Sequence, residues 1–235
     1  MAVVANRSQG DLRAASRGGW WWPGWGSSRV RAGLTDRRTS LADVIRQGPA
    51  AALMHAAQVH GSSIAWLEGY PAGELTVQGC DALISRTPGV GLVIRTADCL
   101  PLFVQDPGRQ VIGIAHAGWR GLAARLPLRF IAAFQRFAHS RPEQLLVAVG
   151  PAIHACCYEV SAEFGRWFEP FLQRRSGRLT CDLIGAARHQ FAAAGVTAEH
   201  WRDSGHCTGC EPDRWFSVRR EGPATGRLHS FIMLE

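Results

Sequence analysis

The sequence contains no lysine, so all 26 of its basic side chains are arginine. The formal net charge is +7, yet the arginines are scattered and no run of five or more basic residues occurs. A nucleic-acid partner is therefore not expected. Guanidinium groups suit phosphate better than ammonium groups do, and positive charge attracts small anions. We expect a small anionic substrate.

Long hydrophobic runs are also missing. The longest stretch without a formal charge, 47–67, contains a proline, two histidines and two serines, which makes it a poor membrane span. Charges at Arg7, Asp11 and Arg13 leave no apolar core for a signal peptide. The seven cysteines are an odd number, which fits a reducing compartment. We expect a cytoplasmic protein that makes no use of a membrane.

Tandem repeats and long linkers are absent as well, so residues 20–235 are expected to form a single domain. Residues 1–19 are rich in Gly, Ser, Arg and Ala and are expected to form a loose arm, with disorder as the alternative. A tryptophan cluster follows at Trp20–Trp25. We favour the interpretation that it covers an edge of the core; the alternative is a patch that docks a partner.

Apolar runs between turn signals predict strands, and helical periodicity predicts helices. Strands are expected at 82–84, 91–94, 102–104, 111–115 and 145–149, with the third and fourth forming a hairpin. Helices are expected at 122–138, beginning near Pro127, and at 162–173 and 183–194. Interleaved helices and a hairpin indicate a mixed α/β or α+β sandwich.

Three short turn-like segments carry His60, Cys99 and His116. Imidazole and thiolate are the ligands that zinc prefers, and three protein ligands leave a fourth position open, as in catalytic sites. Each residue also has an ordinary interpretation: a loop histidine, a buried thiol and a histidine at a strand end. None of the three forms a short ligand pair, so the spacing alone does not bring them together.

A rival cluster lies at His206-Cys207-Thr208-Gly209-Cys210. A CxxC with one adjacent histidine resembles half of a zinc knuckle or a redox pair. No second CxxC completes a structural site, and the vicinal Cys156 and Cys157 are poorly spaced to ligate one ion together. We expect Cys207 and Cys210 to be ordinary thiols near a loop.

Asp98 directly precedes the candidate cysteine ligand. It is expected to orient His60 or His116 through a hydrogen bond, or to act as a general base; the competing interpretation is a carboxylate that accepts backbone N–H groups in its loop. Candidate anion-binding side chains, each with a solvated surface role as the alternative, are Arg37, Arg120, Arg188, Arg219 and Arg220.

Five motifs in order carry a family resemblance: Gln58–Gly61, Thr96–Pro101, Ala115–Gly121, Gly150–Ile153 with Tyr158–Val160, and Phe216–Arg220 with Thr225–Arg227. Over roughly 20–235 the chain resembles the bacterial family named laccase-domain protein, polyphenol oxidase or purine nucleoside phosphorylase, which has a human laccase-domain-containing relative. Thr35-Asp36-Arg37 matches only the opening of a further family motif, so Arg37 matches the family arginine through a short alignment.

The resemblance implies a zinc ion bound by His60, Cys99 and His116, with copper as the alternative metal. It implies an α+β fold, a mixed β-sheet sandwich with flanking helices, similar to a cysteine-hydrolase-like toxin domain. It also implies phosphorolysis of adenosine, inosine, guanosine and methylthioadenosine, and deamination of adenosine. Other members are described as copper-dependent phenol oxidases or peptidoglycan-precursor editing factors.

On this interpretation the partners are a nucleoside and phosphate. Arg37 and Arg120 are expected to hold the phosphate, and Asp98 is expected to shuttle a proton while zinc activates water for deamination. Three rivals stay open: a copper-dependent phenol oxidase, a non-catalytic binding protein, and a cysteine hydrolase with Cys99 as nucleophile and His116 as base. No His-x-His pair occurs, which argues against a trinuclear copper cluster. The oligomeric state is left open.

Overall fold

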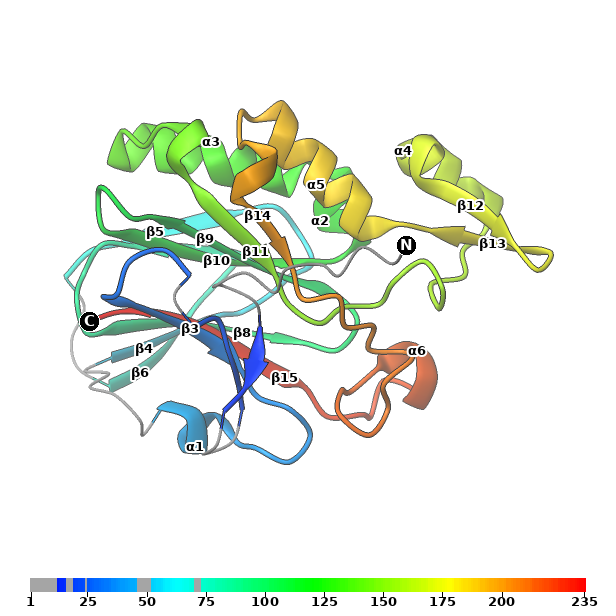
Figure 1. Cartoon of the computed structure of the whole chain (residues 1–235), viewed down its shortest axis with the longest axis horizontal. Coiled ribbons are helices and arrows are strands. Elements are labelled where there is room, and N and C mark those ends of the chain that lie inside the picture. Colours follow the sequence, from blue (N-terminus) through cyan, green and yellow to red (C-terminus); the bar gives the residue numbers. More distant parts are fainter. Residues whose placement is uncertain (1–11, 16–18, 24, 46–51, 70–72) are drawn as a thin grey trace, which may run out of the picture.

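The structure is a computed structural model that describes residues 12–15, 19–23, 25–45, 52–69 and 73–235. Two large mixed sheets pack face to face, and a layer of helices covers the outer face of one of them (Figure 1). The expected α+β sandwich with flanking helices is therefore present. Within the described residues, the helices are too short or too polar to cross a membrane.

The first sheet has seven strands in the order β1-β2-β3-β15-β8-β4-β6. Their bounds are Arg13–Ala14 (β1), Trp20–Trp21 (β2), Val30–Leu34 (β3), Ala52–Ala56 (β4), Gly73–Val77 (β6), Val90–Thr96 (β8) and Leu228–Leu234 (β15). Strand β4 runs parallel to β6 and β8, and the other pairs are antiparallel.

The second sheet has six strands in the order β14-β11-β9-β10-β7-β5. Their bounds are Ile64–Leu67 (β5), Ala82–Ser85 (β7), Leu100–Asp106 (β9), Val111–Ala117 (β10), Leu146–Val149 (β11) and Trp201–Asp203 (β14). The pairs β5–β7 and β11–β14 are parallel. A separate hairpin joins β12 (Leu172–Arg175) to β13 (Arg178–Cys181).

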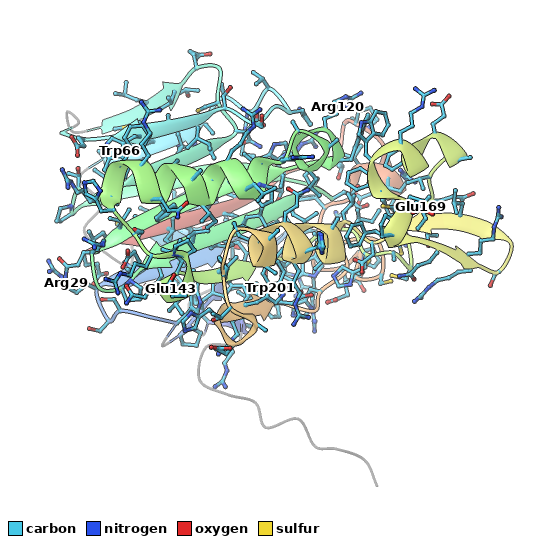
Figure 2. All side chains as sticks on the ribbon, turned by 90° about the horizontal axis from the view of Figure 1, so that it is seen from above. Arg29, Trp66, Arg120, Glu143, Glu169 and Trp201 are labelled. Carbon is cyan, nitrogen blue, oxygen red and sulfur yellow. The ribbon has the colours of Figure 1, made fainter. Side chains whose placement is uncertain are left out.

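Six α-helices are found in the described part of the chain, at Leu41–Ile45 (α1), Trp119–Ala123 (α2), Leu126–Ala138 (α3), Gly165–Phe168 (α4), Leu183–Ala193 (α5) and Val218–Glu221 (α6). Helices α3 and α5 lie side by side across the six-stranded sheet (Figure 2). Helix α1 lies on the outer side of the seven-stranded sheet, where Val44 packs with Val93 and Phe231.

The core has two main parts, one on each face of the six-stranded sheet. Met54 and Leu92 of the first sheet pack with Phe103 and Ile114 of the second between the sheets. On the other face, residues of β9 and β10 pack under α3 and α5. Strands β9 and β10 are thus buried on both faces, which is why they read as continuous apolar runs.

The five predicted strands are confirmed, as are the hairpin and the helices at 126–138 and 183–193. The predicted helix at 162–173 is wrong. That stretch holds a single α turn, α4, between two 3₁₀ turns, and then enters β12. The helix breaks at Phe168, where φ is −130°, two residues before Pro170, which has no N–H to continue the hydrogen-bond ladder.

The tryptophan cluster covers the core, as the favoured interpretation predicted. Trp22 and Trp25 are buried between the sheets, with Trp22 against Phe103. In the expected loose arm, residues 1–11 and 16–18 lie outside the described residues. Residues Arg13–Ala14 do not form a loose arm, because they pair with Trp20–Trp21 as a short strand.

Candidate metal site and its cavity

The structure brings His60, Cys99 and His116 together, as the metal hypothesis expects. One ligand atom of each lies within 4.8 Å of the other two. The imidazole rings of His60 and His116 meet edge to face with centroids 4.8 Å apart. His116 is buried, Cys99 is half-buried and His60 is exposed, so the group has one open side.

Strand pairing explains why Cys99 and His116 meet. They lie just before β9 and near the end of β10, and these antiparallel strands pair Leu100 with Ala117. The next residue, Gly118, leaves room for the thiol: a Cβ there would lie 3.1 Å from the Cys99 Sγ. His60 comes from the loop after β4.

A buried carboxylate, Asp81, fixes both histidine segments. Its Oδ1 lies 2.9 Å from Nδ1 of His116 and accepts the backbone N–H of His60 at 2.9 Å, while Oδ2 accepts the N–H of Gly61 at 2.7 Å. Because a carboxylate only accepts, Nδ1 of His116 carries the proton and Nε2 is left for a ligand. The sequence made Asp98 a candidate to orient His116. In the structure, Asp81 is the carboxylate that orients His116.

Cys99 and His116 shift each other's pKa. Burial raises the pKa of the Cys99 thiol, but hydrogen bonds and charge from His116 and His60 outweigh it and lower the pKa to about 7. Burial lowers the pKa of His116, but hydrogen bonds to Asp81 and Cys99 raise it to about 9. Both shifts favour the charged forms of the two side chains, and metal binding requires that Nε2 of His116 and the Cys99 sulfur carry no proton.

Asp98 is tied into its loop. Its Oδ1 accepts the Thr208 hydroxyl at 2.6 Å, its Oδ2 accepts the backbone N–H of Arg219 at 2.7 Å, and its carbonyl accepts the N–H of Ile153 at 2.9 Å. The alternative that Asp98 accepts backbone N–H groups is therefore realised by Arg219. Asp98 still belongs to the lining of the cavity, and its role in proton transfer stays a prediction.

A cavity of about 700 Å³ opens over the three ligand candidates. Its lining includes the guanidinium-bearing residues Arg95, Arg219 and Arg227. The Arg219 side chain donates to the carbonyl of Glu159 at 2.6 Å and lies over the Tyr158 ring. Within the described residues, no ion pair holds the exposed Arg95 side chain.

Three residues of this cavity have an uncommon backbone conformation. Gln58, His60 and Asp98 have φ angles of 61°, 60° and 92°, a region that residues other than glycine rarely adopt. All three line the cavity. Such strain persists only where surrounding contacts enforce it; at Gln58, for example, the side-chain amide makes two hydrogen bonds to the backbone of Arg95.

The two arginines expected to bind phosphate lie elsewhere. The Arg37 side chain pairs with Glu221, donates to the Trp215 carbonyl and does not line the cavity. Arg120, labelled in Figure 2, is exposed and lies over the Trp119 ring at α2. It is also absent from the lining of the cavity. Their roles stay predictions, while Arg219 is the member of the candidate set that reaches the cavity.

The remaining candidates fall at other places. Arg188 is exposed on α5, and Arg220 lies beside the thiol cluster, where its Nη1 donates to the Gly209 carbonyl at 3.3 Å. Cys156 and Cys157, which the sequence suggests are poorly spaced to ligate one ion together, converge with the two cysteines of the CxxC: the four sulfurs lie within 4.8 Å of one another. The pairing of β11 with β14 brings the two segments together.

The chemistry of the donor set fits a metal at His60, Cys99 and His116. Two imidazoles and a thiolate are a zinc-type donor set with one position left for a solvent or substrate atom. The second nitrogen of His116 is held by a carboxylate, as in many metal sites. In the described part of the chain, this group and the four cysteines are the groups of three or more convergent ligands.

Comparison with known proteins gives a consistent match. The family model described as "multi-copper polyphenol oxidoreductase laccase" matches residues 29–235. The purine nucleoside phosphorylase YlmD of Geobacillus stearothermophilus is 36% identical over 190 residues, covering 74% of this chain and 69% of that protein. Adenosine deaminase RL5, from an unknown prokaryotic organism, is 32% identical over 168 residues, covering 68% and 64%.

The fold matches a solved structure over nearly its whole length. The crystal structure of YlmD from Geobacillus stearothermophilus superposes with a TM-score of 0.86 at 30% identity, covering 95% of this chain and 98% of that one. The overall fold is therefore shared with an experimentally determined structure.

Proposed function

This chain belongs to the laccase-domain family of polyphenol oxidoreductase and nucleoside phosphorylase relatives, and from that premise we propose that it is a zinc-dependent purine nucleoside enzyme. The observation that carries the proposal is one cavity with His60, Cys99 and His116 on one side and three arginines in its lining. A volume of about 700 Å³ suits a nucleoside with phosphate.

The first reaction is phosphorolysis of adenosine, inosine, guanosine or methylthioadenosine. A phosphate oxygen attacks the ribose C1′, the bond from C1′ to N9 breaks, and its electron pair leaves with the base, which takes up a proton. Arg95 and Arg219 bind the phosphate, because both line the cavity and guanidinium groups match phosphate geometry.

The second reaction is hydrolytic deamination of adenosine to inosine. Asp98 accepts the proton of the attacking water and delivers it toward the leaving ammonia. Its position in the cavity lining supports this role, and its hydrogen bonds from Thr208 and Arg219 fix its orientation.

A bound zinc supplies Lewis-acid polarisation of an oxygen or nitrogen at the open position. The His₂Cys set is also a copper donor set, but the cavity lining contains no methionine among the described residues to serve as the weak axial ligand of an electron-transfer copper site. We therefore place zinc before copper, and phenol oxidation after nucleoside chemistry.

The test measures metal content and adenosine turnover on the same sample, with and without inorganic phosphate. We expect about one zinc at this site, and adenine that forms only with phosphate. Asp98→Asn is expected to lose deamination, whereas Thr208→Val, which keeps the carboxylate and removes one of its hydrogen bonds, keeps most of it. Protein that holds zinc and turns over no nucleoside in either buffer contradicts the proposal.

One observation favours a second candidate, a cysteine hydrolase. Cys99 would be the nucleophile, His116 the base and Asp81 the carboxylate that orients the base. The hydrogen bond from His116 to Asp81 is in place, and Cys99 lies beside His116. A cysteine hydrolase keeps its activity after a chelator removes metal and loses it when Cys99 is alkylated. The zinc enzyme loses its activity when the metal is removed. The similarity to a cysteine-hydrolase-like toxin fold stays a prediction.

We also propose that residues 20–235 form one domain and that it works in the cytoplasm. Pairing of β15 with both β3 and β8 supports a single unit, because it joins segments from both ends of that range. Limited proteolysis that releases a stable fragment shorter than this range contradicts it.

A further inference from the structure

Four cysteine sulfurs meet outside the lining of the cavity. The Sγ of Cys156 lies 3.8 Å from that of Cys157, 3.6 Å from that of Cys207 and 3.4 Å from that of Cys210. The Cys157 and Cys210 sulfurs are 3.4 Å apart, and all four lie within 4.8 Å of one another.

This spacing is that of thiolates around one ion. With Zn–S bonds of about 2.3 Å in tetrahedral geometry, neighbouring sulfurs are separated by about 3.8 Å. We propose that Cys156, Cys157, Cys207 and Cys210 form a second metal site, a closed tetrathiolate site for one structural zinc ion. It is distinct from the His60, Cys99 and His116 group.

The fold builds this site from two loops that follow neighbouring parallel strands. One loop follows β11 and the other follows β14, and a bridge between Ala152 and Cys207 extends their pairing. The second loop then turns at Cys207–Cys210, where the N–H of Cys210 donates to the carbonyl of Cys207 at 3.1 Å. The CxxC turn therefore faces the vicinal pair.

Gly209 makes the close approach possible. A Cβ at this position would lie 2.8 Å from the Cβ of Cys157 and 2.9 Å from its Sγ. A side chain there would push the two loops apart and widen the sulfur cluster. The glycine inside the CxxC is thus required by the packing of the four thiols.

The surroundings suit a negatively charged zinc–thiolate group. The backbone N–H of His154 donates to the Cys207 sulfur at 3.4 Å. Three arginines, Arg178, Arg219 and Arg220, line the hollow beside Cys156 and Cys157. Positive charge of this kind offsets the net charge of four thiolates around a divalent ion. Cys156 and Cys210 are exposed, which gives the ion a way in.

Disulfide bonds and iron–sulfur clusters fit the four thiols less well than one metal ion does. All seven cysteines are free, and the neighbouring sulfurs of the cluster are at least 3.4 Å apart, well beyond a disulfide bond. A polynuclear iron–sulfur cluster fills the space between its cysteines and holds the sulfurs further apart than a single ion does. One mononuclear ion matches the observed separations.

The site would stabilise one wall of the cavity. Thr208, inside the CxxC, donates to Asp98, and Ile153, in the other loop, donates to the Asp98 carbonyl. Cys99 follows Asp98 directly in the chain. A zinc that cross-links the two loops therefore holds the segment that presents the Cys99 thiol.

The test counts zinc in purified full-length protein by mass spectrometry and compares four proteins: wild type, His60→Ala, the double variant Cys156→Ser with Cys210→Ser, and the control Cys181→Ala. Cys181 is a buried thiol outside both groups. X-ray absorption at the zinc edge of the His60→Ala protein reports the ligand type without requiring activity.

We expect two zinc ions in the wild type and in Cys181→Ala, and one in His60→Ala with only sulfur neighbours at about 2.3 Å. The double variant is expected to keep one zinc, or to be recovered poorly. A wild type with one zinc that disappears in His60→Ala overturns the proposal even if the double variant fails to fold. Iron in place of zinc, or disulfides between these cysteines in denatured protein, overturns it too.

Discussion

The two ligand groups of this chain differ in openness and in the origin of their ligands. His60, Cys99 and His116 lie at a cavity of about 700 Å³, with a buried carboxylate behind them. The four cysteines lie outside that cavity, on two loops, with arginines around them. Three ligands and an open side suit chemistry, whereas four thiolates close the coordination shell and suit cross-linking.

The two groups also differ in how the backbone around them is held. The first group keeps strained backbone at His60 and Asp98, which only a rigid surrounding sustains. The second group joins the loops that supply this surrounding, through Thr208 and Ile153. We infer that the closed site supports the open one, and the following changes are expected to separate the two.

Cys99→Ala has the largest expected effect. It removes the thiolate from the open group, so one zinc and all nucleoside turnover are expected to be lost, while the four-cysteine zinc remains. Metal analysis and an adenosine assay measure both. Cys181→Ala is the matched control, and a fully active Cys99→Ala protein would falsify the assignment of the open site.

Asp81→Asn is expected to weaken metal binding at the open site by about 10–100-fold, because the hydrogen-bonded carboxylate no longer orients His116. A competition titration with a zinc chelator measures the affinity. Asp106→Asn, a buried carboxylate at the far end of the β9–β10 hairpin, is the control. Equal loss of zinc from the cysteine site contradicts the separation of the two groups.

Arg95→Gln is expected to raise the KM for phosphate by about 10-fold, since a hydrogen bond to a charged group contributes roughly 1.5–3 kcal/mol and this side chain is exposed. The KM for adenosine is expected to change little. Arg120→Gln, outside the cavity, serves as the comparison. If Arg120→Gln raises the phosphate KM and Arg95→Gln does not, the phosphate lies elsewhere.

Cys156→Ser with Cys210→Ser is expected to lower Tm more than activity. A cross-link between loops contributes about 2–5 kcal/mol by analogy with disulfides, which lowers Tm by roughly 5–15 °C in a chain of this size. Turnover below the new Tm is expected to fall only a few-fold. Abolished turnover in folded protein that still holds the open-site zinc means that the cysteines take a direct part in the reaction.

Gly209→Ala is the mildest change. Its new Cβ would meet Cys157 at 2.8 Å, so the loops must shift and the zinc at the cysteine site is expected to exchange faster. Release of zinc to a coloured chelator measures the rate. Gly165→Ala, where the added carbon would make only an ordinary 3.8 Å contact with Leu172, controls for the glycine substitution itself; the same release rate in both variants argues against close packing at Gly209.

Much of the fold could be predicted from the sequence, because β9, β10 and α3 carry strong local patterns. The short motifs that contain His60, Cys99 and His116 could also be recognised in the sequence, from their residue types. Their convergence could not be derived from spacing, since it depends on the register of β9 with β10 and on the loop after β4. The family resemblance, not the periodicity, supplied it.

Several residues of the two sites could not be identified from the sequence, because tertiary contacts determine where they lie. Asp81 stands at the start of a buried strand, where a carboxylate needs partners, and that is the signal that could have identified it. The cysteine cluster was missed because its two halves come together through β14, a strand of three residues with little pattern of its own. Arg95 and Arg227 gave no local signal, because their place in the cavity depends on tertiary contacts.

Strand β15 follows β3 and β8 in the sequence, yet it lies between them in the seven-stranded sheet, where Leu234 pairs with Val30 and Leu228 pairs with Thr96. Until these residues are synthesised, β3 and β8 have no neighbour to join them, and both expose unpaired edges. Chain closure over such long separations slows folding. Until β15 inserts, the edges of β3 and β8 that it covers are open to pairing with another chain.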